Sequence, residues 1–113
     1  MTRVTRPTRA TEKLVSESMF QQTVIQLAKL NGWLCHHTRP ALNRSGKWST
    51  PLQGDPGFVD LVLARDGYVL FVELKREKAK PTAAQMEWIE ALGAQVWYPS
   101  MWDSIVELLA KGA

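Results

Sequence analysis

Residues 58–75 read FVDLVLARDGYVLFVELK, and this stretch decides the fold. Two apolar runs flank an Asp-Gly pair at 66–67, which is a strong β-hairpin signal because both central positions of a type I′ turn need positive φ. Counting outward from a two-residue turn, the sequence predicts that Asp60 faces Glu73 across the strand pair. A three-residue loop with a bulge would shift this register.

The predicted pair of facing acids needs a physical explanation. Directly opposed residues hold their Cβ atoms roughly 4.5–5.5 Å apart, where like charges repel. Lys75 follows Glu73 by two residues and therefore projects from the same face. Apolar residues on both faces of the hairpin predict a central strand pair covered on both sides. A divalent cation bound between the two carboxylates would neutralise their repulsion. The alternative to a metal site is a salt-bridged cluster in which both acids share Lys75.

The composition places limits on the class of protein. A chain of 113 residues with 45% hydrophobic content is expected to form one domain with its own core. Cys35, His36 and His37 are too few to build a zinc cluster. No apolar run reaches the roughly 20 residues that span a bilayer, and no signal peptide is evident, so we expect an intracellular protein that is neither secreted nor bound to membrane. The net charge of +3 suits an anionic partner.

Basic residues gather in three segments. Residues 1–15 are rich in Thr and Arg and are expected to form a disordered arm, which leaves 16–113 as the single folded domain. Residues 39–57 form a long loop that is either functional or a disordered insertion, and basic side chains beside Trp48 suit a nucleic-acid strand. Residues 76–80 form a third basic segment. The candidate DNA-binding residues are Arg39, Arg44, Lys47, Arg76, Lys78 and Lys80.

Periodicity and capping signals predict the remaining elements. A helix is expected over 16–31, capped by Ser16 or by Ser18 in a capping box with Gln21, and ended by Gly32 at the C-cap. Its predicted apolar stripe is Phe20, Val24, Leu27, Ala28 and Leu30. A short strand follows at 33–38.

Two more helices and a strand follow the hairpin. Thr82 and Gln85 form a capping box for a helix that ends at Gly93. Residues 94–98 are a strand, and the helical crossover that precedes it predicts parallel pairing with 68–75. Ser100 with Asp103 opens a last helix, whose predicted inward residues are Trp102, Ile105, Val106 and Leu109. The predicted fold class is α/β, a mixed central sheet flanked by helices in the order α-β-β-β-α-β-α.

Several motifs in order along the chain carry a family resemblance. They are Glu17 and Gln21 in ESMFQ, NGW at 31–33, GFVD ending at Asp60, VELK with Glu73 and Lys75, and Q-x-x-W at Gln85 and Trp88. This set resembles the virus-type replication-repair nuclease domain, VRR-Nuc, of the PD-(D/E)xK superfamily, in the small stand-alone form found in phages. It spans residues 17 to about 98. The family usually has proline before the motif aspartate; here Val59 stands there, and that position supplies no ligand.

The resemblance implies a restriction-endonuclease-like fold and an endonuclease that hydrolyses DNA phosphodiester bonds with Mg²⁺ or Mn²⁺. Asp60 and Glu73 would bind the metal, and the Leu74 backbone carbonyl between the E-x-K side chains is a further candidate ligand. By the same matching Lys75 is the catalytic lysine, Glu17 reaches the metal directly or through water, and Gln85 lines the site. Stand-alone members resemble archaeal Holliday junction resolvases, which implies a homodimer acting on branched DNA. A phage-encoded protein would work in the bacterial cytoplasm.

Two other functions are consistent with the same residues. A DNA-binding module that retains the nuclease fold without catalysis would use the basic segments alone. An interaction domain with a coincidental salt-bridged cluster is the third interpretation, but it leaves the order of Glu17, Asp60, Glu73, Lys75 and Gln85 unexplained.

Overall fold

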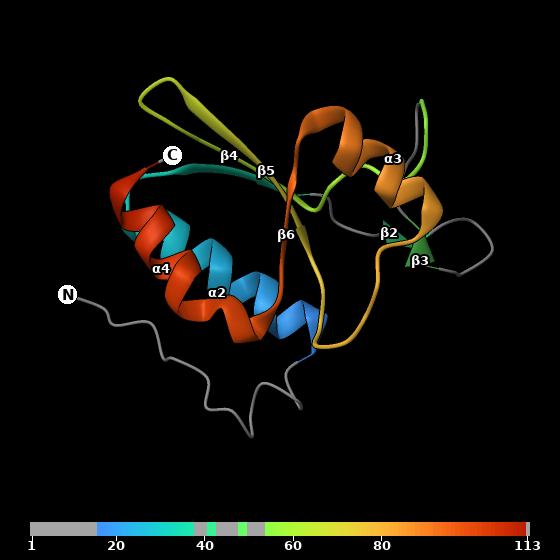
Figure 1. Ribbon diagram of the computed structural model, residues 1–113, viewed down its shortest axis with the longest axis horizontal. Helices are drawn as coiled ribbons and strands as arrows, with labels where there is room; N and C mark the ends of the chain where they lie inside the picture. The colour runs from blue at the N-terminus through green and yellow to red at the C-terminus, as the bar shows by residue number, and fades with distance from the viewer. Residues whose placement is uncertain (1–15, 38–40, 43–47, 50–53, 113) are drawn as a thin grey trace.

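The computed structural model describes residues 16–37, 41–42, 48–49 and 54–112 (Figure 1). Among these residues the helices are α2 (Glu17–Leu30), α3 (Ala83–Leu92) and α4 (Trp102–Lys111), with the 3-10 helix η1 (Pro99–Met101) before α4. The main sheet contains β1 (Leu34–His37), β4 (Leu61–Arg65), β5 (Tyr68–Leu74) and β6 (Gln95–Trp97), and β2 (Ala41–Leu42) pairs with β3 (Trp48–Ser49) separately. The predicted arm and the candidates Arg39, Arg44 and Lys47 lie outside the described residues.

The central hairpin forms in the predicted register. Asp66 and Gly67 have φ of 52° and 86°, the positive values that the turn needs. Pairing runs from Arg65 opposite Tyr68 to Leu61 opposite Val72. The sheet order is β1-β4-β5-β6, with β5 and β6 parallel and the other pairs antiparallel. The predicted mixed sheet with β4 and β5 at its centre is therefore confirmed.

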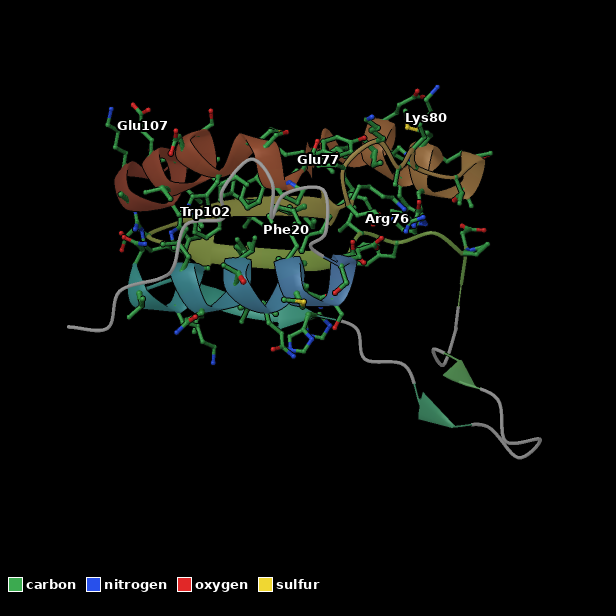
Figure 2. All side chains as sticks on the ribbon, turned by 90° about the horizontal axis from the view of Figure 1, so that it is seen from below. Phe20, Arg76, Glu77, Lys80, Trp102 and Glu107 are labelled. Carbon is green, nitrogen blue, oxygen red and sulfur yellow. The ribbon has the colours of Figure 1, made fainter. Side chains whose placement is uncertain are left out.

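One face of the sheet packs against α2 and α4, which lie side by side on it (Figures 1 and 2). This is the face on which alternate residues of β4 and β5 are buried. The core cluster contains Phe20, Val24, Leu27, Ala28, Trp33, Leu61, Leu63, Leu70, Val72, Leu74, Trp97, Trp102, Ile105 and Leu109. This core fixes the orientation of the strands that carry the acids.

Arg65 ties the hairpin to the ends of both core helices. Its Nη1 donates to the backbone oxygens of Asn31 at 2.8 Å and Leu109 at 3.0 Å. Its guanidinium also lies 4.7 Å from the centre of the Trp33 ring, within the range of a cation–π contact. The carbonyls at helix C-termini lack intrahelical partners, and Arg65 supplies donors to them.

The opposite face is less covered than the sequence predicts. Val69 is 52% exposed and Leu34 is 78% exposed, so the prediction of cover on both sides is wrong for this part of the sheet. The helix α3 packs instead on the segment before β4, where the Phe58 and Trp88 rings meet edge to face at 4.9 Å. A ten-residue helix is only about 15 Å long and cannot cover the remaining face as well.

Helix α2 begins at one of its two predicted caps and differs from the prediction at its end and in one core residue. Ser16 is the N-cap, which confirms that alternative, and its hydroxyl accepts from the Met19 amide at 3.1 Å; the alternative capping box at Ser18 is wrong. Asn31, not Gly32, is the C-cap. Leu30 is 47% exposed, because 3.6 residues per turn place it about 100° from the centre of the buried stripe.

Helix α3 begins as predicted. The Thr82 hydroxyl accepts from the Gln85 amide at 3.2 Å, the Gln85 Oε1 accepts from the Thr82 amide at 2.8 Å, and Gly93 follows in the left-handed region with φ of 65°. This confirms the capping box and the glycine stop.

Helix α4 begins differently from the prediction. The turn η1 precedes it, and no side-chain hydrogen bond caps either element at its N-cap position. Instead the Ser100 amide donates to Glu77 Oε1 at 2.6 Å. The expected opening by Ser100 with Asp103 is wrong because η1 occupies residues 99–101, so that Met101 is the N-cap residue of α4. Val106 is 36% exposed rather than buried.

Gly57 allows α3 to approach the segment before β4. A Cβ built on Gly57 would lie 2.5 Å from the backbone carbon of Ala84, and its φ is +95°. Gly54 has a similar φ of +104°, but a Cβ there meets nothing within 4 Å. We expect Gly57→Ala to lower the free energy of unfolding by about 2–5 kcal/mol, because backbone strain and overpacking add. Gly54→Ala, which adds only strain, should cost about 1–2 kcal/mol.

Urea unfolding at equilibrium measures both variants against the wild type. Equal losses at the two glycines would contradict the close packing of α3 at Gly57.

Candidate active site

Asp60 sits at the point where the β4–β5 ladder ends. The last paired residues are Leu61 and Val72. Asp60 immediately precedes Leu61, and Glu73 immediately follows Val72. The Asp60 Oδ2 accepts a hydrogen bond from the Leu74 amide at 2.8 Å. The donor to the Asp60 carboxylate is therefore the residue that directly follows Glu73. This anchors Asp60 beside Glu73, as the predicted register requires.

Glu73 is fully buried, and neither of its carboxylate oxygens has a hydrogen-bond partner. Burial raises the pKa of Glu73 to about 9, and the negative charge of nearby Asp60 acts in the same direction. Without metal, Glu73 is therefore neutral near pH 7.

Lys75 is 7% exposed and lies directly after β5, two residues beyond Glu73. Its backbone amide donates to the Trp97 carbonyl at 3.0 Å, which fixes the chain at this position. Within the described ranges its ammonium forms no ion pair shorter than 4.0 Å with any carboxylate. Its charge nevertheless lowers the pKa of Glu73. The side chain is near the acids without forming the closed salt bridge of the alternative interpretation.

Glu17 reaches the same region from the first residue of α2. Burial raises its pKa, nearby Asp60 raises it as well, and Lys75 and Arg76 lower it. Glu17 is therefore within electrostatic range of charged groups that precede β4 and that follow β5. Its position in the first helical turn also allows a favourable interaction with the helix dipole. The cluster thus contains Glu17 from α2, Asp60 just before β4, Glu73 on β5 and Lys75 just after β5.

Gln85 is placed differently from the four charged residues. Its Oε1 accepts from the Thr82 amide in the capping box, and no hydrogen bond in the described part of the chain joins Gln85 to an acid of the cluster. The carboxamide nitrogen is not used by that capping bond, so a role toward substrate is still a prediction for it.

The donor set fits a hard cation that keeps water in its coordination shell. Within the described ranges, no three His, Cys, Asp or Glu side chains form a complete ion site on their own. Mg²⁺ is commonly held by one or two carboxylates, with waters and phosphate oxygens filling the other positions. The two Glu73 oxygens, buried and without donors, are the atoms that such an ion would satisfy together with Asp60.

Two residues beside the cluster have roles that sequence reasoning did not assign. Arg76 lowers the pKa of Glu17, in addition to its predicted contact with DNA. Glu77 is half-buried and accepts from the Ser100 amide. Glu77 lies in a run of lysines and arginines, a sequence context that is typical of a solvated surface. No local sequence signal indicates a hydrogen bond to a residue 23 positions away.

Comparison with known proteins gives no match: no family model fits the chain, and no curated protein or solved structure is similar to it. The described helices include none with the length and apolar composition to cross a membrane. The function of the site must therefore be inferred from the geometry of its residues.

The raised pKa of Glu73 predicts a specific dependence of stability on pH. Folded Glu73 holds its proton up to about pH 9, whereas in the unfolded chain it releases the proton near 4.5. Between these values the folded state binds more protons, so stability falls as pH rises. In EDTA we expect the melting temperature to fall more steeply with pH in the wild type than in Glu73→Gln, by at least about 4 °C across this interval, equivalent to roughly 1 kcal/mol.

Differential scanning calorimetry from pH 5 to 9 provides the measurement. Glu107→Gln is the matched control, because its side chain is 65% exposed on α4, and it should follow the wild type. Parallel curves for the wild type and Glu73→Gln would show that Glu73 is not the titrating group.

Proposed function

We propose that this chain is a metal-dependent DNA endonuclease of the VRR-Nuc type, with a restriction-endonuclease-like fold. The observation that carries the proposal is Glu73, a fully buried acid whose two oxygens have no donor and which lies beside a second carboxylate, Asp60. A buried carboxyl without hydrogen-bond partners is costly and is the kind of perturbed group that marks functional sites. The nearby Lys75 supplies the third part of the D…E-x-K pattern.

Asp60 and Glu73 would hold Mg²⁺ or Mn²⁺, with the Leu74 carbonyl as a further candidate ligand. When bound, such an ion supplies Lewis acidity toward a phosphate oxygen and lowers the pKa of a coordinated water. Because no third acid among the described residues joins the pair in a complete site, we assign Glu17 to the outer position, where it acts through water.

The protein's own residues then have separate roles. Lys75 carries a positive charge at a nearly buried position, where it stabilises negative charge that develops on the phosphoryl group far better than an exposed lysine would. Asp60 is held in place by the Leu74 amide and does not need to reorganise during the reaction. Gln85 offers its carboxamide nitrogen to the substrate from the start of α3.

Branched DNA and a homodimer complete the proposal. A two-fold dimer would present two active sites in the symmetry that a four-way junction requires. The basic residues Arg76, Lys78 and Lys80, all exposed directly after the site strand, would contact phosphates.

A DNA-binding module without catalysis is the second candidate. The exposed cations after β5 favour it, because they can contact phosphates without any contribution from the acids. Cleavage distinguishes the two candidates, since only the first requires Asp60 and Lys75.

The test is a cleavage assay with labelled duplex, flap and four-way-junction DNA in Mg²⁺, Mn²⁺ or EDTA. The wild type should cut in either metal, fastest on the junction, and Asp60→Asn and Lys75→Met should each lose at least about 100-fold in rate. Asparagine can still accept from the Leu74 amide, so Asp60→Asn removes the charge and preserves the anchor.

Matched controls are Asp66→Asn, an exposed turn carboxylate, and Lys111→Met, an exposed lysine on α4. Both should retain wild-type rates. Cleavage in EDTA or by Asp60→Asn would rule out the metal mechanism, and DNA binding without cleavage in any metal would favour the second candidate.

A further inference from the structure

The segment 76–80 alternates between exposed cations and half-buried residues. Arg76, Lys78 and Lys80 are exposed, whereas Glu77 and Ala79 are half-buried. Figure 2 shows Glu77 between α4 and α3, with Lys80 beside α3. We call this segment the basic ridge. Its cations all face solvent while its acid faces the protein.

Two hydrogen bonds from other parts of the chain hold the ridge. Glu77 Oε1 accepts from the Ser100 amide at 2.6 Å, and the Tyr98 hydroxyl donates to the Ala79 carbonyl at 2.9 Å. A further bond within the ridge, from the Ala79 amide to the Arg76 carbonyl at 3.1 Å, closes a turn. Both external anchors belong to the connection between β6 and α4, and β6 pairs with β5, the strand that carries Glu73.

The backbone of Lys78 is strained in this turn. Its φ is 67°, in the left-handed region, which is unfavourable for a residue with a side chain. Glycine would adopt this conformation without that cost. Such strain persists only where the surroundings determine the backbone, and here the bonds made by Glu77 and Tyr98 do so. The result is a lysine fixed in an outward position.

The ridge begins at the candidate active site. Arg76 directly follows Lys75, and its charge acts on Glu17 of the acid cluster. A strand of DNA that follows the cations would therefore pass next to the acids.

Electrostatics alone does not explain Glu77. A negative charge among three cations weakens attraction for an anion, so a patch selected only for charge would be better without it. The hydrogen bond from the Ser100 amide to Glu77 holds the backbone of the ridge in place. A binding surface that is already ordered loses less conformational entropy when it binds.

We propose that Glu77 and Tyr98 are positioning residues that hold the basic ridge as a preformed contact for the DNA phosphate backbone beside the acid cluster. The location of the contact next to a cleavage site rests on the proposed function. Binding of the backbone by the ridge does not require cleavage.

The test compares Glu77→Ala with Glu77→Gln in the full chain, by fluorescence anisotropy with labelled four-way-junction DNA in EDTA over a range of KCl concentrations. Both variants remove the charge, but the glutamine carboxamide oxygen still accepts from the Ser100 amide. We expect Glu77→Gln to bind as tightly as the wild type or more tightly, with an equal or steeper salt dependence. Glu77→Ala should bind about 3- to 10-fold more weakly than Glu77→Gln, the range expected for one hydrogen bond.

Two further variants separate positioning from charge and folding. Glu107→Ala removes one negative charge from the exposed face of α4 and should not weaken binding. Tyr98→Phe keeps the ring and removes the bond to Ala79, so it should weaken binding in the same direction as Glu77→Ala. Binding is measured at a temperature at which circular dichroism shows each variant fully folded.

Equal binding by Glu77→Ala and Glu77→Gln would overturn the positioning role even if the protein cleaves DNA. Conversely, a clear difference between them in a protein that cleaves nothing would support the ridge and reject the nuclease.

Discussion

The hydrogen bond from the Leu74 amide to Asp60 Oδ2, at 2.8 Å, holds the acid pair together. A hydrogen bond to a charged group contributes about 1.5–3 kcal/mol, so the Leu74 amide holds the Asp60 carboxylate beside the buried Glu73 carboxyl. The bond forms because the turn at 66–67 sets a register in which β4 begins one residue after Asp60 and pairs Leu61 with Val72. Local turn chemistry thus determines the electrostatics of the site at the far end of the hairpin.

The rest of the fold supports this end of the sheet. The core between the sheet and the helices α2 and α4 fixes the strands, and α2 brings Glu17 to the acids from its first turn (Figure 1). Strand β6 binds the backbone of Lys75 through Trp97. The connection that follows β6 holds the basic ridge. Acids, lysine and ridge are therefore all positioned by β5 and its neighbours.

The features that the sequence predicts well are those with local causes. The hairpin register follows from two turn residues, and the start of α3 follows from Thr82 and Gln85. The start of α4 differs from the prediction because the 3-10 helix η1 precedes it, and the acceptor for an amide of η1, Glu77, lies 23 residues away in the sequence. Exposure of Val69 could not be predicted either, because it depends on where α3 packs. The approach of Glu17 to the acids followed from the family resemblance alone, since no pairing rule relates a helix end to a hairpin.

Mn²⁺ binding tests the proposed cation site at Asp60 and Glu73 without reference to cleavage. Electron paramagnetic resonance measures free Mn²⁺ as the protein is added at neutral pH. We predict that the wild type and Asp66→Asn remove the free signal, whereas Asp60→Asn and Glu73→Gln bind at least about tenfold more weakly, the loss of roughly 1.4 kcal/mol or more. Mn²⁺ binding that is unchanged in both Asp60→Asn and Glu73→Gln would contradict the account.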